Sequence, residues 1–388
     1  MSSSRRNGRF RAVLIVLGLM IGLGISEVCA WGLLRLNPPT APVGRWEFRA
    51  TRPAPYKDAE YFGSDFLDES MRCLRLSNPT GASYLVPGDF QGRFINVRNG
   101  QRLTTDQPEA FEYRLFLFGG STVFCSTVPD SDTLASCLQR ALNATPGPRY
   151  RVENYGAPAM IARQQTERLA ATPLQPGDVV VFYDGFNDVY YPIYNGNPRG
   201  FHPGDSDDGG VRKLGGVQAW LYPRCMRLKT HSYAAEFLFH NLDGPRPANV
   251  VNSRKLNRNL GAAEAGYREA LVTASTDARA RRARFVHALQ PHLFSVHSPD
   301  AYERAVIRNE LKLLPGLDQA CRLGYPRLHQ AATSAATTGF LNLDLSAVLD
   351  ARTEGEEYYL DYCHTNHSAN ERVAHALCDA LRTPTNAE

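Results

Sequence analysis

The sequence predicts an α/β protein, a three-layer α/β/α sandwich around a mostly parallel sheet, with a membrane helix at its N-terminus. Short apolar segments alternate with segments of helical periodicity through residues 112–381. Such alternation favours a parallel sheet covered by helices on both faces. A separate apolar run from Ala12 to Leu34 follows a cluster of arginines, which is typical of a membrane-spanning helix or a signal sequence.

Composition and charge are those of a globular protein. The chain has 388 residues, of which 43% are hydrophobic and 21% charged, and its formal net charge is +4. That length can hold one large domain or two ordinary ones. The arginines are scattered and form no block of like charge, so nucleic acid is not an expected partner.

The N-terminal run is long enough to cross a membrane. As a helix, residues 12–34 measure about 34 Å, against about 30 Å for a hydrocarbon core. We therefore predict a cytoplasmic segment over 1–11, a transmembrane signal-anchor over 12–34, and the rest outside the cytoplasm, in the periplasm or at the cell surface. Val28-Cys29-Ala30 resembles a small-residue cleavage site, so a cleaved signal peptide is the alternative. The arginines ahead of the run are Arg5, Arg6, Arg9 and Arg11.

Cysteines do not define a metal centre. Eight are present and seven follow the apolar run. Export would permit disulfides, and a Cys125–Cys363 bridge is one option, but buried thiols are equally compatible and connectivity cannot be deduced. No Cys-x-x-Cys pair occurs, so neither a zinc site nor any other metal or cofactor is predicted.

Residues 35–110 are predicted to be a linker and an irregular lead-in. Five prolines within 37–55 keep the backbone extended. Residues 56–110 show no helical periodicity, and short apolar runs alternate there with Pro-Gly-Asp and Asn-Gly turns.

The main domain is predicted over residues 111–388. Apolar segments predict strands at 113–118, 150–153, 178–183, 284–289 and 340–345. Helical periodicity covers 133–143, 161–171, 254–282, most of 300–335, and 366–381. Between them, residues 185–250 form a long insertion rich in Gly, Pro and Tyr.

Four segments with chemically useful residues lie at strand ends or in the loops that follow. Ligands of parallel sheets bind beyond the carboxyl ends of the strands, so these segments should meet. Each alone could be a turn or a helix cap, but their order along the chain and their shared position favour a catalytic site. They are Gly119-Gly120-Ser121-Thr122, Asn154-Tyr155-Gly156, Asp184-Gly185-Phe186-Asn187-Asp188 and Asp361-Tyr362-Cys363-His364.

Together these residues supply what acyl transfer needs: a nucleophile, a base, a group that orients the base, and donors for an oxyanion. Ser121 after a glycine pair can present its hydroxyl above the sheet. The backbone N–H groups of Ser121 and Gly156 and the side chain of Asn187 can donate to an oxyanion. Asp361 can hold the imidazole of His364, three residues later, so that its Nε2 accepts the serine proton.

In these four segments the sequence resembles the SGNH hydrolases, or GDSL-like esterases, over about residues 112–383. Gly185–Asp188 matches the family's Gly-x-Asn-Asp, and Asp361–His364 matches its Asp-x-x-His. Gly156 matches the glycine of its second block. The departures are Gly120, where the family has Asp, and Cys125, where a glycine often follows. Gly-Gly-Ser-Thr variants are familiar in its membrane-anchored bacterial branch linked to exopolysaccharides.

The resemblance implies a flavodoxin-like sandwich and a residue for each role. Ser121 would be the nucleophile, and His364 and Asp361 would complete the triad. The oxyanion hole would consist of Ser121, Gly156 and Asn187.

Several neighbouring residues have competing interpretations. His367 could replace His364 as the base, but the spacing from Asp361 favours His364, and His367 is expected to cap the last helix. His287 lies inside a predicted strand and is expected in the core. Tyr190 and Tyr191 follow Asn187 and either bind substrate or pack the insertion.

The leading hypothesis is a membrane-anchored serine esterase that removes O-acyl groups, in particular acetyl, from a carbohydrate or polysaccharide. An O-acetyltransferase acting on a glycan, or a lipase or lysophospholipase, would use the same site. The alternative of another class is a glycan-binding scaffold in polymer export. The expected partners are an acylated glycan and the membrane.

Overall fold

A central sheet of eight strands lies at the centre of the larger compact unit. The computed structural model describes residues 3–36, 53–79, 81–144, 146–202, 253–352 and 355–382, with Ser232 and Ala234. The strand order is β10-β9-β8-β6-β7-β5-β4-β3, and the first five strands in that order are parallel. These five are β6 (Tyr113–Gly119), β7 (Tyr150–Gly156), β8 (Val179–Asp184), β9 (Arg284–Leu289) and β10 (Leu341–Asp344).

The order of the parallel strands reverses direction between β6 and β8. Numbered along the chain, the parallel strands follow the order 2-1-3-4-5, which is the order of flavodoxin-like sheets. The chain runs outward in opposite directions from the boundary between β6 and β8, and ligands of such sheets bind at that boundary. The mainly parallel α/β fold predicted from the alternating pattern is confirmed, and strand ends differ from the predicted ones by at most three residues.

Helices cover both faces of the sheet. Leu115 and Leu117 of β6 face α5 (Leu134–Asn143) and α13 (His367–Arg382). The alternate residues Phe116 and Phe118 face the opposite cluster, because successive strand side chains point to opposite faces. That cluster is covered by α6 (Ala162–Ala170), α10 (Ser253–Ala280) and α12 (Leu317–Ala336).

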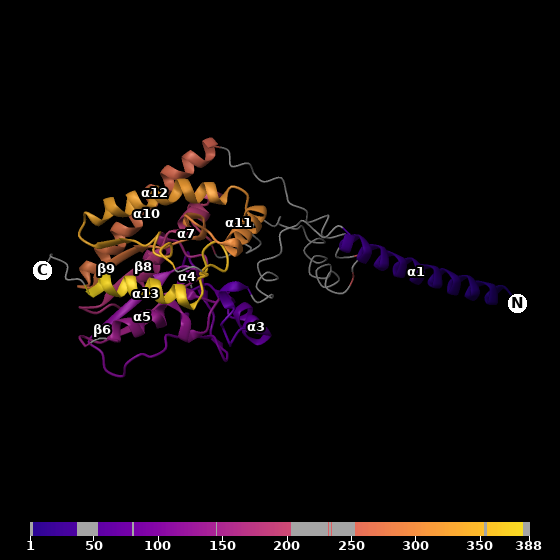
Figure 1. Ribbon diagram of the computed structural model, residues 1–388, viewed down its shortest axis with the longest axis horizontal. Helices are drawn as coiled ribbons and strands as arrows, with labels where there is room; N and C mark the ends of the chain where they lie inside the picture. The colour runs from indigo at the N-terminus through magenta and orange to yellow at the C-terminus, as the bar shows by residue number, and fades with distance from the viewer. Residues whose placement is uncertain are drawn as a thin grey trace. The chain divides into compact units, whose positions relative to one another are not determined.

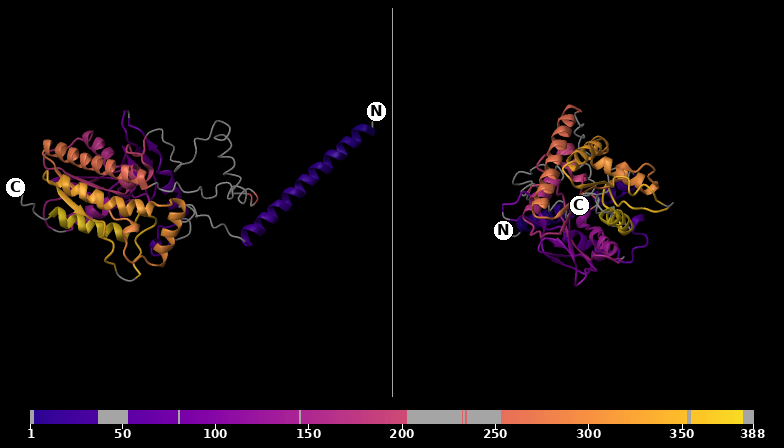
Figure 2. Two further views of the ribbon diagram at one scale, coloured as in Figure 1. Left: turned by 90° about the horizontal axis from the view of Figure 1, so that it is seen from above. Right: turned by 90° about the vertical axis from the view of Figure 1, so that its left-hand side faces the viewer.

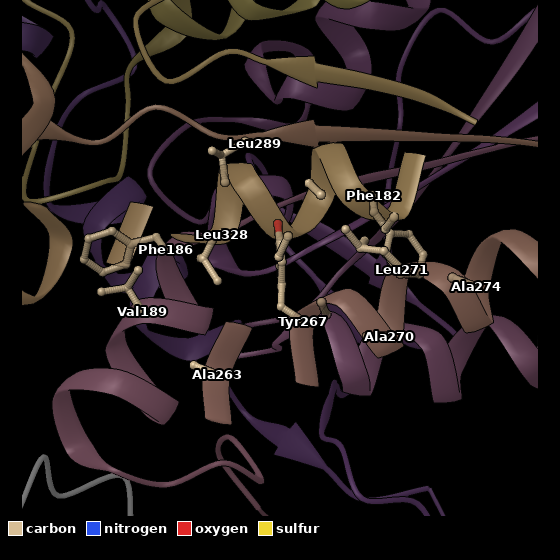
Figure 3. Packing of buried hydrophobic residues seen from close by; sticks show 14 of the residues in the cluster. Phe182, Phe186, Val189, Ala263, Tyr267, Ala270, Leu271, Ala274, Leu289 and Leu328 are labelled. Carbon is tan, nitrogen blue, oxygen red and sulfur yellow. The ribbon is translucent and has the colours of Figure 1, made fainter. Parts of the chain in front are cut away.

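Helix pairs build each outer layer. On one side α10 lies against α12, and on the other α13 lies against α5 (Figures 1 and 2). Figure 3 shows Tyr267 and Leu271 of α10 packed with Phe182 of β8 and Leu328 of α12. The remaining segments after β6 are α4 (Ser121–Phe124), η2 (Asp130–Asp132), α7 (Phe186–Asp188), the π-helix η3 (Val189–Asn195), η4 (Leu293–Ser295) and α11 (Ala301–Leu313).

The lead-in before residue 110 extends the central sheet. Its strands β5 (Gln101–Arg102), β4 (Asn96–Arg98) and β3 (Phe90–Gln91) continue the sheet beyond β7 as antiparallel strands. Its side chains, including Tyr56 and Phe66, pack against Phe124 and Leu360 of the main domain. Further elements are η1 (Ala54–Tyr56), β1 (Leu76–Ser77) and β2 (Val86–Pro87).

One expectation for the lead-in was wrong. The segment Ser64–Arg72 forms a helix, α3, where no helical periodicity was recognised. Only Phe66 and Ser70 are buried in this nine-residue helix. The helix therefore contacts the core over a single turn, and its sequence shows no repeat of apolar residues at helical spacing. Residues 37–52 of the linker expected over 37–55, and most of the insertion expected over 185–250, lie outside the described residues.

The chain divides into two compact units, Met1–Pro42 with Ser206–Ala248, and Val43–Asp205 with Asn249–Glu388. The first contains α1 (Ser3–Leu36). Within α1, Leu14–Leu33 is long and apolar enough to cross a membrane, a test that a signal sequence also passes. Its Glu27 carboxylate accepts hydrogen bonds from the Ser232 hydroxyl and the Ala234 N–H.

Candidate active site

A chain of three side chains connects the first and last predicted site segments. Ser121 Oγ lies 2.7 Å from His364 Nε2. The Nδ1 atom of the same imidazole lies 2.7 Å from Asp361 Oδ2. The Asp361 carboxylate is almost fully buried, whereas the His364 side chain keeps 13% of its surface exposed. The structure therefore brings together three residues that are 243 positions apart at their extremes.

Asp361 and His364 lie at the tip of the His364 hairpin, which we define as residues 358–366. Backbone hydrogen bonds from Leu360 N–H to His364 O and from Asn366 N–H to Tyr358 O close it. Within the tip, Asp361 Oδ1 accepts the backbone N–H groups of Cys363 and His364, at 3.0 and 2.8 Å. These two donors fix the carboxylate, and the carboxylate in turn fixes the imidazole orientation.

Ser121 stands at the start of α4, directly beyond β6. The N–H groups of Val123 and Phe124 donate to Gly120 O at 3.1 Å. The first N–H groups of a helix have no acceptor within it, so the N–H of Ser121 is a candidate oxyanion donor. The helix ends after one turn because Cys125 adopts a left-handed conformation, with φ +55°. A glycine would meet that conformation at less cost, so a cysteine at this position carries backbone strain.

Asn187 and Gly120 approach each other closely. Asn187 Nδ2 donates to Met160 O at 3.0 Å, and a primary amide carries a second hydrogen. A Cβ atom at position 120 would lie 2.3 Å from that same Nδ2. The missing side chain at Gly120 thus gives the Asn187 amide its place beside Ser121.

Gly156 lies beneath α4 at the end of β7. A Cβ there would lie 2.3 Å from Phe124 N, so the helix can approach only because the residue is glycine. Its N–H donates to Asn154 Oδ1 at 2.9 Å, and Asn154 Nδ2 donates to Val123 O at 2.9 Å. Asn154 therefore ties α4 to β7. Because the Gly156 N–H has this acceptor, its assignment to the oxyanion hole stays a prediction.

Aromatic rings extend from the His364 hairpin along the start of the insertion. Tyr362 stacks on Phe186 with ring centroids 4.6 Å apart and lies 6.1 Å from the His364 ring. Tyr190 stacks on Phe186 at 6.5 Å, and Tyr191 meets Tyr190 edge-on at 5.0 Å. Tyr190 and Tyr362 are partly buried against the core. The sequence assigned no role to Tyr362, because its stacking on Phe186 is a tertiary contact that no local pattern indicates.

The competing histidines lie in other environments. His367 begins α13 and pairs with Asp132 and Glu371 at 3.6 and 3.2 Å. The α13 cap is the preceding Asn366, whose Oδ1 accepts the Ala369 N–H, so the expected capping role of His367 was wrong. His287 is fully buried, as expected, and it contacts Tyr267 and Asn342.

The buried groups beside the site include two thiols and one carboxyl. Cys125 and Cys363 are buried thiols, so the optional disulfide between them is not formed. Burial, followed by the negative charge of Asp184, raises the pKa of Asp188 well above its ordinary value. The Asp188 carboxyl accepts the Ala162 N–H at 3.0 Å, which joins the loop after β8 to the start of α6.

A cavity of about 390 Å³ lies at the base of the His364 hairpin. It is lined by Tyr61 and Tyr358, by several carboxylates including Glu60 and Glu357, and by His367. Neither Ser121 nor His364 lines it. The cavity is therefore separate from the contact between Ser121 and His364.

No family model and no curated protein matches the chain. Among solved structures, it is similar to a member of the lipolytic protein G-D-S-L family from Veillonella parvula, with 13% identity, 71% of this chain and 100% of that chain covered, and a TM-score of 0.39. An acetylxylan esterase from Geobacillus stearothermophilus matches with 14% identity, coverage of 71% and 97%, and a TM-score of 0.37. These values are too low to carry a function to this chain, so the functional argument depends on the geometry of the site.

Proposed function

We propose that the protein is a serine-dependent ester hydrolase with Ser121 as its nucleophile, His364 as its base and Asp361 as the group that orients the base. The observation that carries this proposal is a pair of consecutive hydrogen bonds. One joins Asp361 Oδ2 to His364 Nδ1 and the other joins His364 Nε2 to Ser121 Oγ, each at 2.7 Å. Nucleophile and base lie within the reach that proton transfer requires.

Each step follows from that arrangement. Ser121 Oγ attacks the ester carbonyl carbon while its proton passes to His364 Nε2. The leaving alcohol takes that proton as the tetrahedral intermediate collapses, which leaves Ser121 acylated. Water then gives a proton to His364 and attacks the acyl carbon, and the acid departs as the proton returns to Ser121 Oγ. Asp361 holds the Nδ1 proton throughout and stabilises the imidazolium.

The developing oxyanion needs donors on the side of Ser121 away from His364. The backbone N–H of Ser121 and the second hydrogen of Asn187 Nδ2 supply them, supported by the close approach of that amide to Gly120. Gly156 contributes a third N–H when its hydrogen bond to Asn154 is shared. One such donor is worth about 10²–10³ in kcat.

The proposed substrate is an O-acylated carbohydrate, with acetyl as the acyl group. The resemblance of the four sequence segments to the SGNH hydrolases supports this class. So does the row of aromatic rings that begins with Tyr362, 6.1 Å from the His364 ring, and continues through Tyr190 to Tyr191, because aromatic faces can pack against a sugar ring.

The domain is proposed to act outside the cytoplasm, anchored by Leu14–Leu33. The apolar run continues past the possible cleavage site through Trp31, Leu33 and Leu34, which supports an uncleaved anchor. Carbonate extraction of the expressed full chain tests this idea: an anchored chain stays in the membrane pellet at its full mass. Release of a shortened soluble chain would favour a cleaved signal sequence.

Covalent labelling tests the chemistry most directly. The full chain should react with a fluorophosphonate probe and hydrolyse a short-chain aryl acetate. Ser121→Ala should lose both, while Ser131→Ala, at an exposed serine, should keep both. A probe that labels neither protein would reject the nucleophile. Adding an acetylated glycan and an acceptor glycan then measures how the acyl group divides between water and sugar.

A further inference from the structure

The tip of the His364 hairpin places three metal-binding atoms together. The carboxylate of Asp361, the thiol of Cys363 and Nδ1 of His364 offer one donor atom each, and all three atoms lie within 4.8 Å of one another. Cys363 Sγ is 3.9 Å from His364 Nδ1. In the described part of the chain, this is the one such cluster of three His, Cys, Asp or Glu residues.

The donor types and spacings suit Zn²⁺. Zinc binds thiolate sulfur at about 2.3 Å and imidazole nitrogen or carboxylate oxygen at about 2.0–2.2 Å in a tetrahedral arrangement. Two nitrogen or oxygen ligands of such an ion lie about 3.3 Å apart. The His364 Nδ1 to Asp361 Oδ2 distance of 2.7 Å must therefore open by about half an ångström. The sulfur-to-nitrogen distance already allows an ion between the two atoms.

We propose that this cluster, Asp361, Cys363 and His364, binds Zn²⁺ or a similar thiophilic divalent ion, and that binding switches the proposed esterase off. The inhibition part rests on the proposed function, because the metal takes two groups that the hydrolysis needs. The missing Cys-x-x-Cys pair excludes a structural zinc site of that type, but it does not bear on a cluster built around the catalytic pair.

Proton movements explain why an occupied site would be inactive. Cys363 gives up its thiol proton to solvent when the sulfur binds the ion. The Nδ1 proton of His364 is displaced, and the neutral ring carries its proton on Nε2 instead. A protonated Nε2 cannot accept the Ser121 proton, and Asp361 is engaged by the ion. Metal binding and acyl transfer therefore exclude each other.

Inhibition of the full chain is the first test. Aryl acetate hydrolysis should fall with rising Zn²⁺ and return when EDTA removes the ion. Each variant is normalised to its own activity without metal. Cys363→Ser should raise the half-inhibiting concentration about tenfold or more, since even outer partners of metal ligands are worth 10–100-fold. Cys378→Ser, a thiol on α13, is the matched control and should behave as the wild type. Equal inhibition of the wild type and Cys363→Ser would overturn the proposal.

A spectroscopic test does not depend on turnover. Co²⁺ added to the full chain should give thiolate-to-cobalt charge-transfer absorption in the near ultraviolet. The band should vanish in Cys363→Ser and persist in Cys378→Ser and Ser121→Ala. Absence of the band from the wild type, or its persistence in Cys363→Ser, would overturn the site. If the band behaves as expected but no ester is hydrolysed, the proposed function fails and the metal site stands.

Discussion

Arg102 should couple the stability of the lead-in to the position of the nucleophile. Its side chain is fully buried and forms an ion pair with Asp130, with Nε and Oδ1 2.5 Å apart. Its remaining nitrogens donate at 2.9–3.1 Å to the backbone carbonyls that end α4 and begin the next turn, those of Phe124, Cys125 and Val128. A residue of the lead-in thus holds the short helix that begins with Ser121.

The structure gives the magnitude of this effect. Arg102→Met would leave the buried Asp130 carboxylate with only the two donors of Asn96, at 3.1 and 2.8 Å. Removing one partner of a buried ion pair costs about 3–5 kcal/mol. Arg102→Met combined with Asp130→Asn removes the uncompensated charge. The double variant should therefore be more stable than the sum of the two single changes predicts, by up to about 3 kcal/mol.

Denaturant unfolding of the full chain, followed by circular dichroism, measures the free energies for this double-mutant cycle. The kcat for an aryl acetate, measured well below the unfolding transition, reports the position of Ser121 and should fall in Arg102→Met. Arg98→Met, at an exposed arginine of the neighbouring strand β4, is the control and should change stability by less than about 0.5 kcal/mol. A cost below about 1 kcal/mol for Arg102→Met would refute the argument that this buried ion pair holds the turn.

Three further changes test the site and its surroundings. Asn187→Ala should lower kcat for an aryl acetate about 10²–10³-fold with a small change in KM, because it removes an oxyanion donor; an unchanged kcat would dismiss that role. Gly120→Asp introduces the residue that SGNH hydrolases carry in their first block, but it should lower kcat, because its Cβ would lie 2.3 Å from Asn187 Nδ2. Burial lowers the pKa of His292 to about 3, so the unfolded chain binds more protons between that value and about 6.5, and the folded state should lose stability as pH falls through this range. His292→Phe should remove about 2 kcal/mol of this loss between pH 7 and pH 4.5, as measured by unfolding at both values; equal acid sensitivity in both proteins would contradict it.

The sequence was informative where local chemistry decides structure. The strand over residues 179–184 was predictable because six buried positions in a row require an apolar run. The contact between Asp361 and His364 was predictable because two residues three positions apart in one tight turn can bring a carboxylate to an imidazole. The approach of His364 to Ser121 followed from a general property of parallel sheets, whose strand ends meet at one edge.

Contacts between residues far apart in the chain could not be predicted from the sequence. Arg102 lies in a two-residue strand, and nothing in its neighbourhood indicates that its guanidinium reaches carbonyls 22–26 positions away. The antiparallel extension of the sheet was missed for the same reason, since strands of two or three residues show no alternation. The link from Asn154 to Val123 is also a tertiary contact, which a turn-like Asn-x-Gly pattern does not reveal.

The structure gives one reason for glycine at both position 120 and position 156. From the sequence, both glycines suggested turns, yet neither has a positive φ angle. Each instead allows another segment to come close: the Asn187 amide at Gly120 and the backbone of α4 at Gly156. Any side chain at Gly156 would push α4 outward and carry Ser121 away from His364, whereas one at Gly120 would displace the Asn187 amide and leave the nucleophile near its base. Substitution at Gly156 should therefore slow phosphonylation of Ser121 by fluorophosphonates as well as ester turnover. Substitution at Gly120 should affect mainly the steps that depend on the oxyanion.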